Sequence, residues 1–319
     1  MNAKAKLFLG KLLIVFSVFL VSLGIILMFS GDEKLMHPIY DVTVISKADN
    51  ETVSITTIAS DEEVSDTGTS TKIEQDINPS DDGQSVGKPS AVEVSLLLRK
   101  QIEKTYGVTV KYASETNGYS VGGMSTISIN DPVISQNALI TLNMALALYP
   151  QGFFQEIKSK GYPLTFYLIK RYSTDNVTGV TDSSNKNVVI SVATDYDFID
   201  TFHHEVYHYI ERYILNSGGK YTSWNSLNPV GFKYGVIDSS YSYSRDFSQD
   251  AFFVNSYAMT DQYEDRASTF EYMMKTNKAS CLNYGKTIWL KARTMSEQID
   301  YFFNTVTPTV TEHWERHLY

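Results

Sequence analysis

The chain has 319 residues and a formal charge of -9, from 27 Lys and Arg against 36 Asp and Glu. Ten of the acids lie between residues 49 and 82 beside a single base, Lys72, so the remainder holds 26 charges of each sign and no basic field for binding nucleic acid. The single cysteine, Cys281, excludes an internal disulfide framework and any zinc site built on paired cysteines.

Residues 12–30 contain no charge and no proline, which predicts a transmembrane helix. A segment of this length, at about 1.5 Å per residue, spans a hydrocarbon core of roughly 30 Å. Lys4, Lys6 and Lys11 precede it, so the N-terminus is expected inside the cell and the rest of the chain outside. Because no small-residue cleavage site follows, residues 1–31 are read as an uncleaved membrane anchor; a cleaved signal peptide, giving a secreted protein, is the alternative.

Residues 32–91 are expected to form a disordered, acidic, extracytoplasmic linker. Within them, residues 46–91 are rich in Ser, Thr, Asp and Gly and contain no aromatic residue. Such a segment cannot bury enough apolar surface to offset the entropy lost on ordering. The folded domain is expected to occupy residues 92–319, a plausible length for one domain.

Within this domain the predicted elements alternate before they become mostly helical. The spacing of apolar residues, together with Gly, Pro and β-branched residues, predicts the following. The first elements are a helix over 92–106 ended by Gly107, a strand over 108–113 and a helix over 132–149. Neighbouring strands follow over 164–172 and 188–193, and then a helix from Thr194 or Asp195 to 215 with Gly218 as its stop. The last elements are a loop over 239–255 and helices over 262–275 and 286–303. Strands followed by a group of helices favour an α+β domain with a small sheet.

The sequence His204-Glu205-Val206-Tyr207-His208 lies in the helix predicted to end at residue 215. At 3.6 residues per turn, His204 and His208 lie on one face, where both imidazoles can bind one metal ion. Two histidine nitrogens suit Zn²⁺, and Glu205 between them can act as base toward a metal-bound water. The alternative is that both histidines are ordinary polar residues of a half-buried helix. Neighbouring His203 has no spacing partner and is expected to be structural.

A zinc hydrolase needs a third protein ligand and an open position for water. A histidine six residues after His208 is absent, because that position is Ile214. A carboxylate from a second helix is the next possibility, and the candidates downstream are Glu264, Asp265 and Glu271.

HEVYH followed by YAMTDQYEDRASTF resembles the gluzincin metallopeptidases, and within them the lethal-factor type and related bacterial zinc peptidases. The resemblance spans roughly residues 188–275 and implies a zincin-like metallopeptidase domain, with HExxH on the active-site helix and a helical C-terminal part. It implies that Glu264 is the third zinc ligand and that Tyr257, seven residues earlier, is a catalytic tyrosine. The stretch WNSLNPVGFKY, from Trp224 to Tyr234, also resembles a segment of those peptidases but has no chemical role that can be named.

One position departs from the resemblance. The residue four after Glu264 is acidic in the family and is Ser268 here, so the carboxylate that orients a ligand histidine is either missing or replaced by Asp265 or Glu271. For Glu264 the alternative role is a first-turn acid favoured by the helix dipole, and for Tyr257 it is packing or surface exposure.

These patterns predict a membrane-anchored, extracytoplasmic zinc metallopeptidase that hydrolyses a peptide or protein substrate. Zinc held by His204, His208 and Glu264 would activate a water molecule, Glu205 would take its proton, and Tyr257 would stabilise the oxyanion. Two alternatives remain: a non-catalytic surface binding or adhesion module on the same scaffold, and an amidase acting on cell-wall peptide with the same residues. Tyr241 and Tyr243 are expected in a loop or cleft rim, and Cys281 in a buried position.

Overall fold

The structure is a computed structural model. It describes residues 39–47, 50–58, 89–182, 188–194, 198–238, 241, 251–274, 286–307, 310–316 and 318. The predicted membrane segment, Tyr243 and Cys281 lie outside these residues. No helix in the described ranges is long and apolar enough to cross a membrane.

The central sheet has four strands in the order β3-β6-β9-β8. Its strands are β3 (Thr109–Tyr112), β6 (Leu164–Ile169), β9 (Val188–Ala193) and β8 (Gly179–Asp182). The first three pair in parallel, whereas β8 pairs antiparallel to β9 at the edge. The prediction that residues 164–172 and 188–193 contain neighbouring strands is confirmed by β6 and β9. A smaller sheet joins β4 (Ser120–Val121), β5 (Met124–Ile127) and β7 (Arg171–Tyr172).

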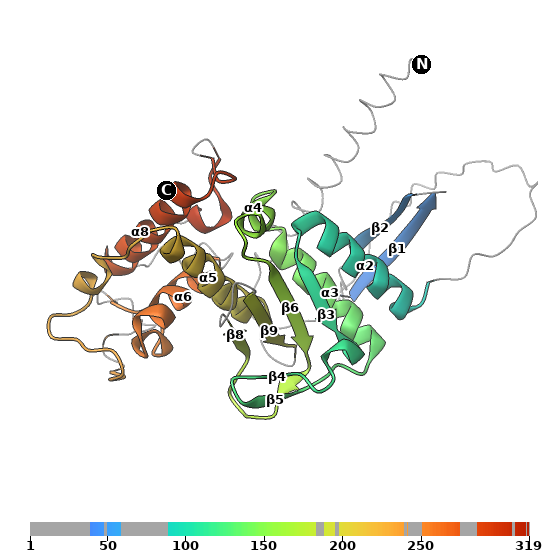
Figure 1. Ribbon diagram of the computed structural model, residues 1–319, viewed down its shortest axis with the longest axis horizontal. Helices are drawn as coiled ribbons and strands as arrows, with labels where there is room; N and C mark the ends of the chain where they lie inside the picture. The colour runs from blue at the N-terminus through green and yellow to red at the C-terminus, as the bar shows by residue number, and fades with distance from the viewer. Residues whose placement is uncertain are drawn as a thin grey trace, which may run out of the picture.

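Helices complete an α+β fold, as predicted, with strands and helices arranged as in Figure 1. The helices are α2 (Ala91–Tyr106), α3 (Pro132–Leu146), α4 (Phe153–Ser159), α5 (Phe198–Asn216), α6 (Gln262–Met273) and α8 (Lys286–Phe302). Ser90 begins α2 with a capping box, and Gly107 ends it at a φ of 72°. Gly218, the predicted stop of α5, has a φ of 95°.

The residues of β6 divide between the two faces of the sheet. Leu164, Phe166 and Leu168 are buried in one core with side chains of α2, α3 and α5. Tyr167 belongs to the other face, where its ring stacks on Tyr119 with centroids 4.0 Å apart. The three helices therefore share one face of the sheet, and α5 lies beside β8 and β9.

The structure differs from the prediction of a disordered linker over residues 32–91. Strands β1 (Ile39–Lys47) and β2 (Asn50–Ile58) pair antiparallel within that segment. Most of the acidic residues follow residue 58, whereas the paired strands are rich in Val, Ile and Thr. The average composition of residues 32–91 does not distinguish the part rich in Val, Ile and Thr from the acidic part that follows it.

Some elements have no counterpart in the sequence prediction. Helix α4 has only seven residues and begins after Gly152 at a φ of 88°, and β4, β5 and β8 have two to four residues each. Segments this short carry too few positions to show a periodicity. Helix α3 ends three residues before the predicted boundary, at Leu146.

A cluster of buried charges fixes α6 against α5 and α8. Arg266 pairs with Glu211 of α5, and both side chains are almost completely buried. Asp265 Oδ2 accepts a hydrogen bond from Lys291 Nζ of α8 at 2.8 Å, and both side chains are inaccessible to solvent. The same oxygen accepts bonds from Trp224 Nε1 and Tyr234 OH at 2.8 and 2.7 Å. Buried charges are tolerated only when paired in this way.

Replacing Lys291 with Met should lower the free energy of unfolding by about 3 to 5 kcal/mol, because Asp265 would remain as a buried carboxylate without a cation. Urea denaturation measures the loss. Arg293→Met on the same helix is the matched control: its pair with Glu297 is more than half exposed, and its loss should cost about 0.5 kcal/mol or less. Equal losses in the two variants would contradict the prediction.

Candidate functional site

Helix α5 supplies three residues of the site. Phe202, Val206 and Ile210 are inaccessible and pack into the core. The opposite side of the same turns carries His204 and His208, whose ring centroids lie 5.0 Å apart. The helical period places the two imidazoles next to each other, as the spacing predicted.

The first turn of α6 brings Glu264 to these histidines. The Asp261 side chain caps the helix by accepting bonds from the backbone N–H groups of Tyr263 and Glu264. Glu264 Oε2 then lies 2.9 Å from His204 Nε2 and 3.5 Å from His208 Nε2. One ligand atom from each of these three residues lies within 4.8 Å of the other two. Elsewhere in the described ranges no other group of His, Cys, Asp or Glu meets this condition.

The pKa values at this cluster show that it favours positive charge. Burial lowers the pKa of His204, but hydrogen bonds to Glu264 and Glu271 outweigh it and raise that pKa to about 10. Burial raises the pKa of Glu264, and the two histidines reverse this and hold it well below its usual range. The Glu264 carboxylate thus stabilises a positive charge between the imidazoles, whether a proton or a cation carries it.

Glu205 lies beside the cluster and contacts β8. Its carboxylate Oε2 accepts a hydrogen bond from the Thr181 hydroxyl at 2.6 Å. The side chain is buried, and burial raises the pKa of Glu205 against the lowering effects of His208, His204 and Thr181. A buried carboxylate of raised pKa next to a metal-type cluster has the properties of a general base.

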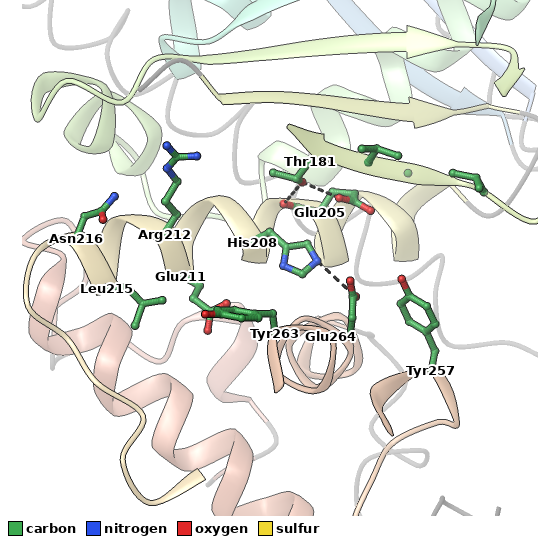
Figure 2. Close-up of a pocket in the computed structure, with 13 residues that line it drawn as sticks. Thr181, Glu205, His208, Glu211, Arg212, Leu215, Asn216, Tyr257, Tyr263 and Glu264 are labelled. Carbon is green, nitrogen blue, oxygen red and sulfur yellow. Dashed lines mark hydrogen bonds and ion pairs between the residues drawn. The ribbon is translucent and has the colours of Figure 1, made fainter. Parts of the chain in front are cut away.

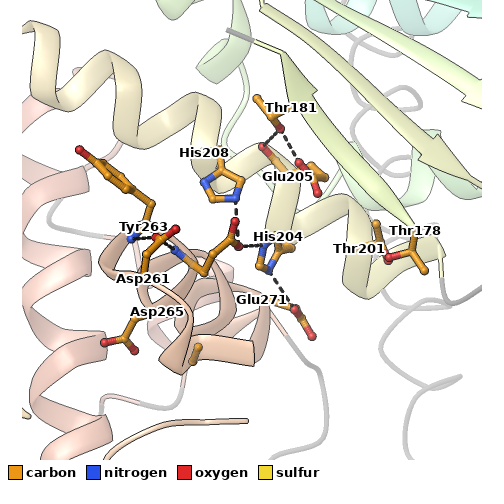
Figure 3. Close-up of polar contacts among 12 residues, drawn as sticks. Thr178, Thr181, Thr201, His204, Glu205, His208, Asp261, Tyr263, Asp265 and Glu271 are labelled. Atoms are coloured by element: carbon orange, nitrogen blue, oxygen red, sulfur yellow. Dashed lines mark hydrogen bonds and ion pairs between the residues drawn. The ribbon is translucent and has the colours of Figure 1, made fainter. Parts of the chain in front are cut away.

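Glu271 is the second acid that lies next to His204. Its Oε2 is 3.3 Å from His204 Nδ1 (Figure 3), whereas Glu264 contacts Nε2 of the same ring. Asp265, the other candidate, is bonded to Lys291 instead. Ser268 is buried and offers no carboxylate. Glu271 lies seven residues after Glu264, two helical turns along the same face of α6. This spacing is the signal in the sequence that could have identified Glu271 as the acid beside His204.

Tyr257 lies at the mouth of the site on a short 3-10 turn, η4 (Tyr257–Met259). It is 53% exposed, and its ring centroid lies 5.8 Å from that of His204. Burial of its hydroxyl and the nearby Glu264 and Glu205 raise its pKa, so the phenol keeps its proton and remains a hydrogen-bond donor at neutral pH.

Two other residues and one stretch singled out in the sequence lie outside the cluster. His203 points into the core, where its Nδ1 is 2.9 Å from Tyr149 OH. Tyr241 packs near Phe232 in a separate apolar group. The stretch from Trp224 to Tyr234 helps to hold α6, because the side chains of Trp224 and Tyr234 both donate hydrogen bonds to Asp265, the residue after Glu264.

A cleft of about 720 Å³ opens beside the cluster (Figure 2). Strand β8 lines one side, α5 the floor, and Tyr257, Tyr263 and Glu264 the other side. Its wall is apolar at Val177, Val180 and Leu215 and polar at Arg212 and Asn216. Glu205, His208 and Glu264 all line this cleft, so a ligand in it can reach the predicted catalytic residues.

No protein-family model matches the sequence, and no curated protein is similar to it. Among solved structures, the fold is similar to a candidate zinc-binding metallopeptidase from Bacteroides caccae. The match has 12% identity and a TM-score of 0.44, and it covers 72% of this chain and 92% of the other.

Proposed function

We propose that the protein is a zinc-dependent metallopeptidase of the gluzincin, lethal-factor-like type. The observation that carries this proposal is the group formed by His204, His208 and Glu264, with Glu205 beside it in the same cleft. The three ligand residues come from two helices and lie 60 positions apart at their extremes. Glu205, His208 and Glu264 line one cleft, and His204 contacts Glu264 beside them.

The donor set fits zinc. Two imidazole nitrogens and one carboxylate oxygen, with room for a water in a fourth position, are the ligands of a catalytic zinc site. The distances of 2.9 and 3.5 Å from Glu264 Oε2 to His204 Nε2 and His208 Nε2 are compatible with one shared ion, since two atoms that each lie about 2.0 to 2.2 Å from the same zinc are at most about 4.4 Å apart. A bound zinc would polarise the scissile carbonyl and lower the pKa of water to about 7.

The protein's own side chains supply the remaining chemistry. Glu205 takes the proton of the attacking water and returns it to the leaving amine. Tyr257 donates its phenolic proton in a hydrogen bond to the oxyanion that develops on the carbonyl. Glu271 accepts from His204 Nδ1, which would leave Nε2 free to hold a metal ion. The apolar and polar walls of the cleft hold the substrate chain.

A non-catalytic binding module is less well supported. The sequence feature that favours such a module is Ser268, which stands where an acid is expected four residues after Glu264. Glu271 provides a carboxylate to the same imidazole from two turns along the helix. The departure at residue 268 is thereby compensated, and peptide hydrolysis is the function that the whole group supports.

We also propose that residues 12–30 anchor the protein in a membrane with the catalytic domain outside the cell. The support is the length and apolar composition of the segment and the lysines that precede it.

The wild-type protein should bind one zinc per chain and cleave peptides. Glu205→Gln should retain zinc and lose activity by about 10²- to 10⁴-fold, because it removes only the base. Glu264→Ala should lose stoichiometric zinc. Metal analysis and a library of quenched fluorescent peptides test both. A purified wild-type protein that takes up no zinc would refute the proposal.

Glu271→Ala should weaken zinc binding by about 10- to 100-fold, because His204 would lose the acceptor that fixes its ring. Competition with a chromogenic chelator measures the affinity. Glu297→Ala, at an exposed position of α8, is the control and should leave the affinity unchanged. An unchanged affinity in Glu271→Ala would show that this contact does not support the metal site.

Tyr257→Phe should lower kcat on the order of 100-fold while zinc content stays unchanged, since it removes one donor to the oxyanion. Steady-state kinetics with a cleaved peptide provide the measurement. Tyr263→Phe removes the hydroxyl of another tyrosine on the cleft and should affect kcat far less. Equal effects in the two variants would argue that the cleft depends on tyrosine hydroxyls in general.

A further inference from the structure

We propose that Thr181 of the edge strand is a positioning residue that holds the Glu205 carboxylate for proton transfer. The inference rests on the proposed function, in which Glu205 is the base. It concerns a residue that lies outside the HExxH segment in the sequence, since Thr181 precedes Glu205 by 24 positions.

The Thr181 hydroxyl makes two contacts with the same residue. Its Oγ1 lies 2.6 Å from Glu205 Oε2 and 2.9 Å from the Glu205 backbone oxygen. A hydroxyl has one proton to donate, and the shorter distance and the charge of the carboxylate favour Oε2 as its main acceptor. One oxygen of the base is therefore held from β8.

The other carboxylate oxygen is confined by Gly179, two residues earlier on the same strand. A Cβ on Gly179 would lie 2.7 Å from Glu205 Cγ and 2.8 Å from Glu205 Oε1, closer than such atoms approach. Gly179 and Thr181 both pair with β9, through Val192 and Ile190, so the backbone that confines Glu205 is part of the sheet. The strand thus limits the carboxylate on two sides.

This confinement matters because a base must lie within about 2.6 to 3.2 Å of the proton that it removes. The Glu205 side chain has several rotatable bonds, and its neighbours His204 and His208 attract the carboxylate electrostatically. A neutral hydroxyl on the side away from the histidines, as Figure 3 shows, holds the carboxylate without taking its charge.

The alternative is a purely structural role, in which the Thr181 hydroxyl only links β8 to α5. A similar tie lies beside it: Thr201 Oγ1 of α5 is 3.2 Å from Oγ1 of Thr178, the residue before β8, and neither hydroxyl is bonded to Glu205 (Figure 3). Thr178→Val is therefore a matched control, since it removes a hydroxyl contact between the same two segments.

The test compares wild type, Thr181→Val, Thr181→Ser and Thr178→Val as full-length, zinc-loaded proteins on a library of quenched fluorescent peptides. Thr181→Val should lower kcat by about 10- to 100-fold, as loss of a supporting hydrogen bond at a catalytic group does, with zinc content and KM little changed. Thr181→Ser, which keeps the hydroxyl, should restore most of kcat. Thr178→Val should match wild type.

A second measurement does not depend on turnover. The fall in the urea midpoint caused by Thr181→Val should be smaller in a Glu205→Ala background than in the wild type, because the main partner of the hydroxyl is already gone. Equal falls in both backgrounds, unchanged kcat in Thr181→Val, or equal impairment of Thr181→Ser or Thr178→Val would overturn the inference. If the wild type cleaves and only these results fail, the proposed function stands; a wild type that cleaves no peptide removes both.

Discussion

The site depends on the buried charge pairs that hold the first turn of α6. Glu264, Asp265 and Arg266 are consecutive, and each points to a different partner: the histidines of α5, Lys291 of α8, and Glu211 of α5. Successive residues of a helix project about 100° apart, so three adjacent charges cannot share one surface. Because Asp265 and Arg266 are buried and paired, the rotation of α6 about its axis is fixed, and Glu264 is directed at the imidazoles.

Carboxylates outnumber imidazoles at the site. Three carboxylates, from Glu205, Glu264 and Glu271, lie around two imidazoles, while the Glu211 carboxylate nearby is already paired with Arg266. With neutral histidines this arrangement carries three negative charges in a partly buried space. A divalent cation would offset two of these negative charges. Protonation of both histidines would offset two charges in the absence of a cation. If the cluster binds a metal ion as proposed, metal binding would be linked to proton release.

Sequence patterns predicted the parts of the site that lie within one element. The spacing of His204 and His208 on one helix, and the helical and strand periods of α2, β6, β9, α6 and α8, all appear in the chain itself. The choice between Asp265 and Glu271 could not be made, because it depends on the rotation of α6, which Lys291 sets from a helix further along the chain. The contact of Thr181 with Glu205 depends in the same way on strand register, and the short β8 gives no periodic signal.

The contacts of Asp265 also affect the order in which the parts of the protein fold. Trp224 and Tyr234 lie before it in the chain and Lys291 after it, and all three bind one oxygen atom. Until α8 docks, Asp265 lacks its cation, and a helix turn with a buried unpaired carboxylate is unstable. The two histidines can be in place on α5 well before this, but Glu264 cannot be held against them. A chain that lacks α8 thus carries the HExxH helix without Glu264 held against the two histidines, so the site proposed to hydrolyse peptides is complete only after α8 has docked.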